Sequence, residues 1–197
     1  MIRISDFGFR VSKFRERAAF TILELLIVIT IIIILAALII GTVGYVQKKA
    51  ARSRAEAEIA AMSAACESYK ADNGTYPTDP SKTEQVDPTA SPVPTPATNY
   101  LYEELSGNTA TTMQPAPNKK TYFNFKPQML FGAKDANNNL TSVSYIRDPF
   151  GNPYGYSTAK AANPANSTGF NPTFDIWSTA GTSSNTQSDQ AQWIKNW

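Results

Sequence analysis

The chain has 197 residues and a formal net charge of +2. Most of its excess positive charge lies in residues 1–19, and the rest is close to neutral, so nucleic acid is not expected as a partner. The sequence contains no histidine and one cysteine, which excludes a Ser-His-Asp or Cys-His catalytic pair, a histidine-based zinc site and an intramolecular disulfide. No spacing of acidic residues indicates a carboxylate enzyme, so we expect a protein that is not an enzyme.

Residues 1–19 form a basic, polar leader, and the following stretch from Leu25 to Val46, LLIVITIIIILAALIIGTVGYV, contains no charged residue. As a helix, this stretch spans the roughly 30 Å hydrocarbon core of a bilayer. It exceeds the usual apolar region of a secretory signal peptide, and no A-x-A-like cleavage site follows it. We therefore predict a transmembrane helix over residues 20–46. Basic residues on both sides favour a cytoplasmic leader only slightly.

Residues 47–73 are rich in Ala, Glu, Lys and Arg and contain no proline, so the helix is predicted to continue from about Phe20 to Asp72. Their apolar side chains recur on one narrow stripe: Ile59, Met62, Cys66 and Tyr69. This pattern predicts an amphipathic helix that packs on a folded domain. Cys66 is expected to be a small buried hydrophobic residue, and Gly74 is expected to end the helix.

Residues 74–120 begin with a stretch dense in Pro and Thr. Its prolines argue against regular structure and predict an extended surface loop, with a solvated connector favoured over a binding role. The segment NYLYEELSG that follows predicts a short helical turn ending at Gly107.

Residues 121–197 are expected to form strands and turns. The segments TYFNFKP, LTSVSYIRD, PYGYSTA and TFDIWST are short, rich in aromatic and β-branched residues, and separated by Asn, Gly and Pro. Alternation is clearest where Val143, Tyr145 and Arg147 would share one face. A small antiparallel sheet packed on the amphipathic helix makes the expected fold class α+β.

One carboxylate, Glu24, stands at the boundary of the apolar stretch, where an acid costs about 2.5–3.5 kcal/mol on insertion scales. It follows a basic leader that ends in small residues, then Phe20, Thr21 and two aliphatic residues. A side chain that merely reaches toward the head groups is one interpretation. The arrangement as a whole resembles the class III signal of type IV prepilins and type II secretion pseudopilins.

That resemblance implies a pilin-like α+β fold and proteolytic processing. A membrane-embedded aspartyl prepilin peptidase would cleave between Ala19 and Phe20 and methylate the new amino terminus. The family prefers Gly at the position that Ala19 occupies. Glu24 matches the acid that the family retains for assembly, so Phe20 and Glu24 are the expected assembly residues.

In a filament, the Glu24 carboxylate of one subunit would meet the Phe20 ammonium of its neighbour. Two unit charges 4 Å apart attract by about 4 kcal/mol at an effective dielectric constant of 20, before desolvation is subtracted. An unpaired acid among packed helices is penalised, so Glu24 would set the axial offset between subunits. Head-to-tail contacts that do not close produce a helical filament.

Three further motifs resemble the major pseudopilin subfamily: SYKADNGTYPT, DPFGNPYGY and FDIWSTAG, the last followed by WIKNW. Phe150 stands where Trp is common in that subfamily. The Pro/Thr-rich loop and the segment Asn137–Asn139 lie outside the resemblance. We expect structural roles, turn formation and core packing, for the motif residues Asp148, Pro149, Gly151, Asn152, Pro153, Tyr154, Asp175, Trp177 and Ser178.

Major pseudopilins resemble one another in binding calcium near the C-terminus, and calcium requires six to eight oxygen ligands. Here the corresponding loop offers one carboxylate, Asp189, and the family's acidic ligand positions correspond to Thr182 and to a position near Trp193. We therefore expect a metal-free loop and no cofactor, with a weak calcium site at Asp189 as the alternative.

The resemblance implies a structural subunit of a type II secretion pseudopilus in the inner membrane, with its C-terminal domain in the periplasm. Expected partners are the prepilin peptidase, the inner-membrane assembly platform, other pseudopilins and further copies of the same chain. One alternative is a type IV pilus subunit for adhesion, motility or DNA uptake. Another is a membrane-anchored binding domain that keeps its leader.

Overall fold

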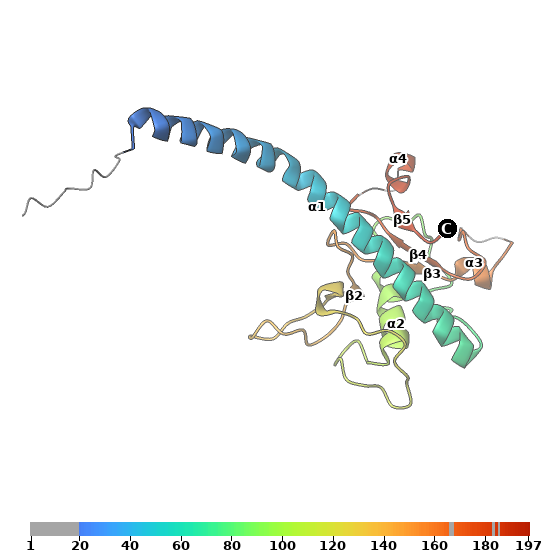
Figure 1. Cartoon of the computed structure of the whole chain (residues 1–197). Coiled ribbons are helices and arrows are strands. Elements are labelled where there is room, and N and C mark those ends of the chain that lie inside the picture. The colour runs from blue at the N-terminus through green and yellow to red at the C-terminus, as the bar shows by residue number, and fades with distance from the viewer. Residues whose placement is uncertain (1–19, 166–167, 183, 185) are drawn as a thin grey trace, which may run out of the picture. The chain divides into compact units, whose positions relative to one another are not determined.

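The computed structural model describes residues 20–165, 168–182, 184 and 186–197. The predicted leader, residues 1–19, lies outside the described residues. The elements are α1 (Ile22–Asn73), α2 (Thr95–Ser106), the 3-10 helix η1 (Pro127–Met129), β1 (Leu130–Phe131), β2 (Tyr145–Ile146), β3 (Gly155–Ser157), α3 (Ala159–Ala162), β4 (Asp175–Ser178), α4 (Gln187–Gln190) and β5 (Ile194–Lys195) (Figure 1). The chain divides into two compact units, Met1–Tyr45 and Val46–Trp197.

Helix α1 begins in the first unit, where its apolar side chains are exposed from Ile22 onward. Within the described part of the chain, α1 is the one helix that has the length and composition to cross a membrane. An unpartnered apolar helix surface of this extent has a strong tendency to enter lipid or to pack on other helices.

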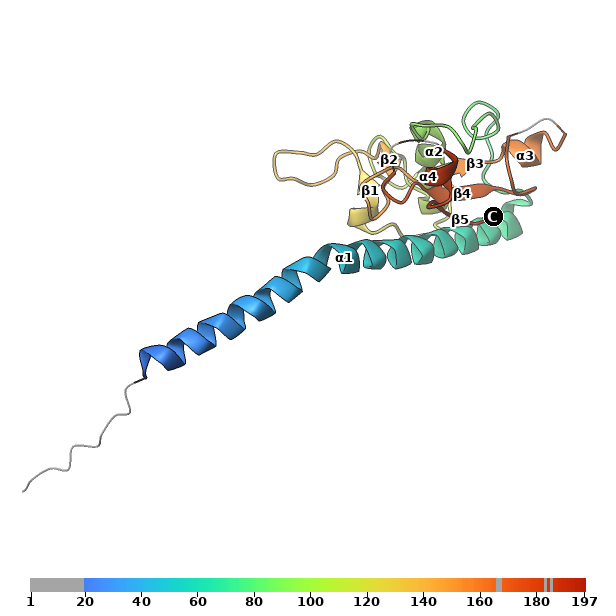
Figure 2. The same cartoon turned by 90° about the horizontal axis from the view of Figure 1, so that it is seen from above.

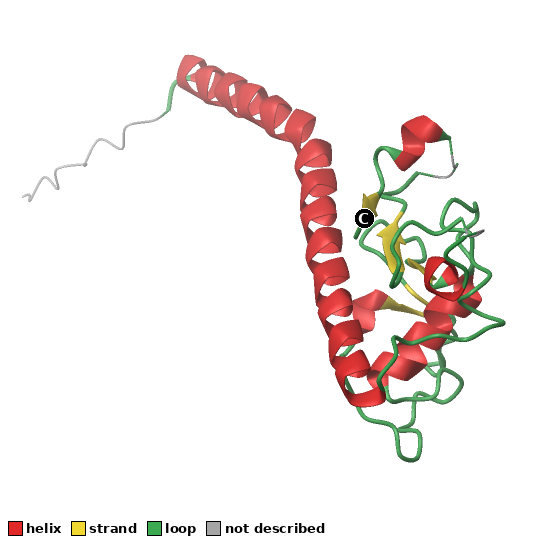
Figure 3. Ribbon diagram, turned by 90° about the vertical axis from the view of Figure 1, so that its right-hand side faces the viewer, coloured by secondary structure: helices red, strands yellow, loops and turns green. Residues whose placement is uncertain are grey.

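The second unit contains the remaining part of α1, which lies beside α2 and the strands β3 to β5 (Figures 2 and 3). The predicted stripe is confirmed: Ile59, Met62 and Cys66 are buried, and Tyr69 is half-buried against the core. Ala55 extends the stripe by one further turn. Small and medium-sized apolar residues on this face allow the helix to approach the domain closely.

Helix α2 is longer than the predicted turn and begins inside the Pro/Thr-rich stretch. The prediction that prolines exclude regular structure is wrong at Pro96, because it lies in the first helical turn, where no intrahelical N–H is required. The predicted end at Gly107 is confirmed, and this residue has the left-handed backbone (φ 72°) that favours glycine.

The loop that precedes α2 is packed against the domain rather than solvated. Thr83, Val86 and Val93 are buried, and the Ser157 hydroxyl donates a hydrogen bond to the Val86 carbonyl at 2.7 Å. The interpretation of this stretch as a solvated connector is therefore wrong. Its scattered apolar residues contact the core even though their spacing follows no helical or strand period.

Two small antiparallel sheets follow α2 along the chain, one with the order β1-β2 and the other with the order β3-β4-β5. Gly155 pairs with Trp177, and Trp177 pairs with Lys195 on the opposite side. The predicted strand at residues 121–127 is absent, because the N–H groups of Tyr122 and Phe123 both donate to the Leu105 carbonyl at the end of α2.

The predicted alternation in the next segment is also wrong. Ile146 is the buried residue of β2, and Tyr145 and Arg147 are only half-buried. Val143 is buried but lies before the strand, where its N–H donates to the Ala110 carbonyl. A change of direction between Val143 and Tyr145 therefore moves the buried face by one residue.

The core of the second unit is rich in aromatic residues from the C-terminal segments. Tyr154, Tyr156 and Trp177 are completely buried, together with Tyr102 of α2. The observed architecture, a long N-terminal helix and small antiparallel sheets, confirms the predicted α+β, pilin-like fold.

Candidate functional site

The first candidate site is the start of α1, where Thr21 and Glu24 form hydrogen bonds with each other. The Glu24 N–H donates to the Thr21 Oγ1 at 3.2 Å. In return, the N–H and the hydroxyl of Thr21 both donate to the Glu24 Oε2, each at 3.4 Å. This reciprocal pattern is a capping box, and it satisfies donors that would otherwise lack a partner at the helix start.

The capping box gives Glu24 a local structural role that the sequence analysis missed, although the T-x-x-E spacing is the sequence signal for it. The carboxylate is held at the positive end of the helix dipole, a favourable position for a negative charge. Phe20 precedes the helix and is 79% exposed. Ala19, the other residue of the predicted cleavage site, lies outside the described residues.

The second candidate site is the turn that begins at Asp148, which is only 2% exposed. Its Oδ1 accepts hydrogen bonds from the N–H groups of Phe150 (3.0 Å) and Asn152 (2.8 Å). Its Oδ2 accepts a hydrogen bond from the Ser178 hydroxyl of β4. Gly151 lies in the turn with a φ of 97°. Asp148 therefore holds its own turn together and also joins it to the sheet.

Two buried aspartates of this region have perturbed acidities. Burial raises the pKa of the Asp148 carboxyl above its ordinary value, while the hydrogen bonds from Ser178 and from backbone N–H groups oppose that rise. Burial likewise raises the pKa of the Asp175 carboxyl, which accepts hydrogen bonds from the N–H groups of Phe170 and Asn171. Both carboxylates are thus structural acceptors inside the domain.

The remaining motif residues extend this connection to α1. Pro153 and Arg147 form an isolated antiparallel β-bridge. The next residue, Tyr154, is buried, and its hydroxyl donates a hydrogen bond to the Glu58 Oε2 at 2.7 Å. The Nε of Arg54 lies 2.8 Å from the other oxygen of Glu58. The hydrogen bond between Tyr154 and Glu58 thus connects the turn that begins at Asp148 to helix α1.

The loop around Asp189 contains the residue considered for calcium. Its carboxylate accepts hydrogen bonds from the hydroxyls of Ser184 and Thr186. The Thr182 hydroxyl accepts a hydrogen bond from the Trp193 indole N–H at 2.9 Å. Within the described residues, no group of three or more His, Cys, Asp or Glu side chains could hold a metal ion. The metal-free loop stays a prediction.

Cys66 is the remaining residue with a potentially reactive side chain. It is completely buried in the stripe of α1. Burial raises the pKa of its thiol far above the ordinary value, so the reactive thiolate is not formed at neutral pH. The buried hydrophobic role predicted for Cys66 is confirmed.

A long apolar N-terminal helix that continues into a small α+β domain is a pilin-like fold. Comparison with known proteins gives relatives of that class. Core protein G of the type II secretion system of Aeromonas hydrophila is 37% identical over 82 residues, 41% of this chain and 57% of that protein. The same protein of Pectobacterium carotovorum subsp. carotovorum is 36% identical over 98 residues, 46% of this chain and 60% of that protein. That of Vibrio cholerae serotype O1 is 36% identical over 66 residues, 34% of this chain and 45% of that protein.

The resemblance to the major pseudopilin is confirmed by these relatives and by a fourth one from Dickeya chrysanthemi, which has the same name. The chain spans about half the length of the relatives it matches. No family model matches the chain, and no solved structure gives a significant match.

Proposed function

We propose that this protein is a pseudopilin of a type II secretion system and acts as a structural subunit, not as an enzyme. The observation that carries the proposal is its similarity to type II secretion core protein G in four bacteria. The apolar start of α1 supports a single membrane span. We place the protein in the bacterial inner membrane, with residues 47–197 in the periplasm.

The second step of the proposal is maturation by a prepilin peptidase, which cleaves between Ala19 and Phe20 and methylates the new amine. The capping box is compatible with this cut, because its donors belong to Thr21 and Glu24 and remain after the leader is removed. The new Phe20 ammonium then stands one residue before the box. Its positive charge complements the Glu24 carboxylate of a neighbouring subunit.

The third step is assembly into a helical periplasmic filament that helps export folded proteins. The capping box contacts Oε2, and Oε1 of Glu24 has no hydrogen bond within the described residues. One carboxylate can therefore cap its own helix and also accept an ammonium of a neighbour. The inner-membrane assembly platform and other pseudopilins are the further partners of this proposal.

The experiment that tests maturation is the intact mass and N-terminal sequence of the protein purified from its native membrane. We expect a chain that begins at N-methylated Phe20. A matched culture that lacks the prepilin peptidase should yield the chain with its leader. A chain that still begins at Met1 in cells with an active peptidase would contradict the proposal and favour an ordinary anchored domain.

A second experiment separates the pseudopilin from a type IV pilus subunit, which shares Phe20 and Glu24. Deletion of the gene should abolish secretion of folded exoproteins, and complementation should restore it. Loss of surface filaments with secretion intact would instead identify a pilus subunit.

A further inference from the structure

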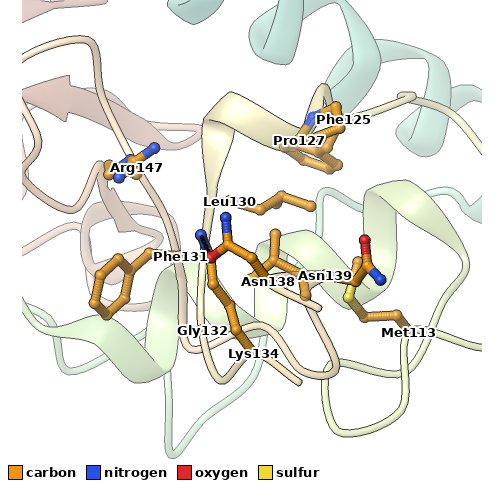
Figure 4. Close-up of a pocket in the computed structure, with 11 residues that line it drawn as sticks. Met113, Phe125, Pro127, Leu130, Phe131, Gly132, Lys134, Asn138, Asn139 and Arg147 are labelled. Carbon is orange, nitrogen blue, oxygen red and sulfur yellow. Dashed lines mark hydrogen bonds between the residues drawn. The ribbon is translucent and has the colours of Figure 1, made fainter. Parts of the chain in front are cut away.

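A cavity of the second unit, with a volume of about 670 Å³, lies beside the β1–β2 hairpin. It involves neither the start of α1 nor the Asp148 carboxylate. Its lining residues are Met113, Phe125, Pro127, Leu130, Phe131, Gly132, Lys134, Asn138, Asn139, Leu140 and Arg147 (Figure 4). We call it the hairpin pocket. Asn138 and Asn139 belong to the segment that lies outside the resemblance to pseudopilins.

The body of the hairpin pocket is apolar. Phe125 and Leu130 are buried and form part of its wall. Met113 is half-buried and has a φ of 56°, an uncommon value for a residue with a long side chain. A volume between 300 and about 1,000 Å³ with a mainly apolar lining is typical of pockets for small molecules.

The charged residues of the pocket have a single sign. Lys134 and Arg147 line it, and none of its lining residues is acidic. Neither cation forms an ion pair within the described residues. Their hydrogen bonds go to neutral groups, from the Lys134 Nζ to the Asn138 Oδ1 (2.9 Å) and from the Arg147 guanidinium to the Gln128 carbonyl (3.2 Å).

The nearest acid along the hairpin, Asp135, forms no ion pair with either cation within the described residues. It is not part of the pocket lining, and its carboxylate accepts hydrogen bonds from the N–H groups of Asn137 (2.9 Å) and Asn139 (2.8 Å) within its own turn. The pocket therefore combines an apolar body with two cations that form no ion pair in the part of the chain that the structure describes.

The arrangement also has a direction. In Figure 4, Arg147 lies on the same side as Phe131, and Met113 lies at the opposite end, with Leu130 between them. Phe131 is exposed to 45% and stacks on Tyr145 with ring centroids 4.7 Å apart. In this view, the cationic Arg147 and the aromatic Phe131 thus lie at one end of the pocket, and the apolar Met113 lies at the other.

We propose that the hairpin pocket binds an apolar carboxylate, a small molecule with a hydrocarbon body and one negatively charged head group. Lys134 and Arg147 contact the carboxylate, which gains charge-assisted hydrogen bonds. The hydrocarbon body displaces water from Met113, Phe125 and Leu130. A single side chain of a partner protein would fill only a small part of the cavity, so the volume favours a whole small molecule.

The test uses the full chain in lipid nanodiscs with ¹³C-labelled methionine methyl groups, and octanoate as the probe. Met113 lines the pocket, whereas Met62 is buried in the stripe of α1 and serves as an internal control. We expect the Met113 signal to shift saturably with octanoate and the Met62 signal to stay unchanged. Octanamide, which has the same chain length and no charge, should bind at least about fivefold more weakly.

Variants test the two cations separately from the fold. The double variant Lys134→Gln/Arg147→Gln should weaken octanoate binding about fivefold or more. The control Lys160→Gln removes a positive charge from α3, outside the pocket, and should leave binding unchanged. The Met62 and Met129 signals report whether each variant is folded.

Three results would overturn the proposal. The Met113 signal does not shift with octanoate, or it shifts equally with octanamide, or the double variant binds octanoate as the wild type does. A Met113 shift that only an unlabelled second copy of the chain produces would identify a subunit contact in place of a ligand site.

Discussion

Removal of the Tyr154 hydroxyl tests whether the DPFGNPYGY motif stabilises the domain through helix α1. In the variant Tyr154→Phe, the aromatic ring stays in the core, so no cavity forms. The lost interaction is the hydrogen bond to the Glu58 Oε2 at 2.7 Å. The Glu58 side chain is only 12% exposed, so water replaces the hydroxyl poorly.

The expected magnitude follows from that environment. A hydrogen bond to a charged group contributes about 1.5–3 kcal/mol. Arg54 still neutralises Glu58 in the variant, with its Nε 2.8 Å from the carboxylate. We therefore expect a loss near the lower end, about 1.5 kcal/mol of unfolding free energy.

The assay is urea unfolding of the full chain in detergent, followed by tryptophan fluorescence. The chain has three tryptophans, and all of them lie in residues 177–197, so the signal reports the second unit alone. Tyr145→Phe is the matched control, because the Tyr145 hydroxyl has no hydrogen bond within the described part of the chain. The control should change the unfolding free energy by less than about 0.5 kcal/mol.

A double-mutant cycle with Glu58→Gln measures the interaction directly. We expect a coupling energy of about 1 kcal/mol between positions 58 and 154. Equal stabilities of Tyr154→Phe and Tyr145→Phe, or strictly additive effects in the cycle, would refute the reasoning.

Three further predictions concern other parts of the chain. The pKa of Asp148 is raised in the folded state, so its contribution to stability is present below its ordinary pKa and is lost as the pH rises through the raised value. The unfolding free energy of Asp148→Asn minus that of the wild type should therefore increase with pH. A difference that does not change with pH would contradict the raised pKa of Asp148. In Gly155→Ala, the added Cβ would lie 2.0 Å from the Cε2 of the buried Trp177, so we expect a loss of about 1–3 kcal/mol in the same urea assay; wild-type stability would refute the overlap. Glu24→Ala should abolish filament assembly and leave the urea midpoint of the second unit unchanged, and normal filaments seen by electron microscopy would argue against the assembly role.

The elements that the sequence predicted well are those whose signal is local. The apolar stretch, the stripe at Ile59, Met62 and Cys66, and the helix end at Gly107 all depend on residues within one or two turns. The capping box at Thr21 and Glu24 is equally local and was available from the T-x-x-E spacing.

The errors occurred where a distant segment competes for the same groups. The sequence pattern predicted a strand at Tyr122 and Phe123, but their N–H groups donate hydrogen bonds to the Leu105 carbonyl at the end of α2. The sequence predicted a solvated Pro/Thr-rich loop, but segments far along the chain bury Thr83 and Val86. Local propensity carries no information about such partners.

The sequence by itself determined the long apolar helix, its amphipathic continuation and the position of Glu24, because hydrophobic periodicity and capping act over a few residues. The tertiary structure alone decided which groups meet across the domain. The hydrogen bond between Ser178 and Asp148 joins residues 30 positions apart, and that between Tyr154 and Glu58 joins residues 96 positions apart. The hairpin pocket likewise forms only because the fold brings Met113 and Arg147, which are far apart in the sequence, to the lining of the same cavity. Such contacts depend on how the elements pack, because each buried polar group needs a hydrogen-bond partner that can come from any part of the domain.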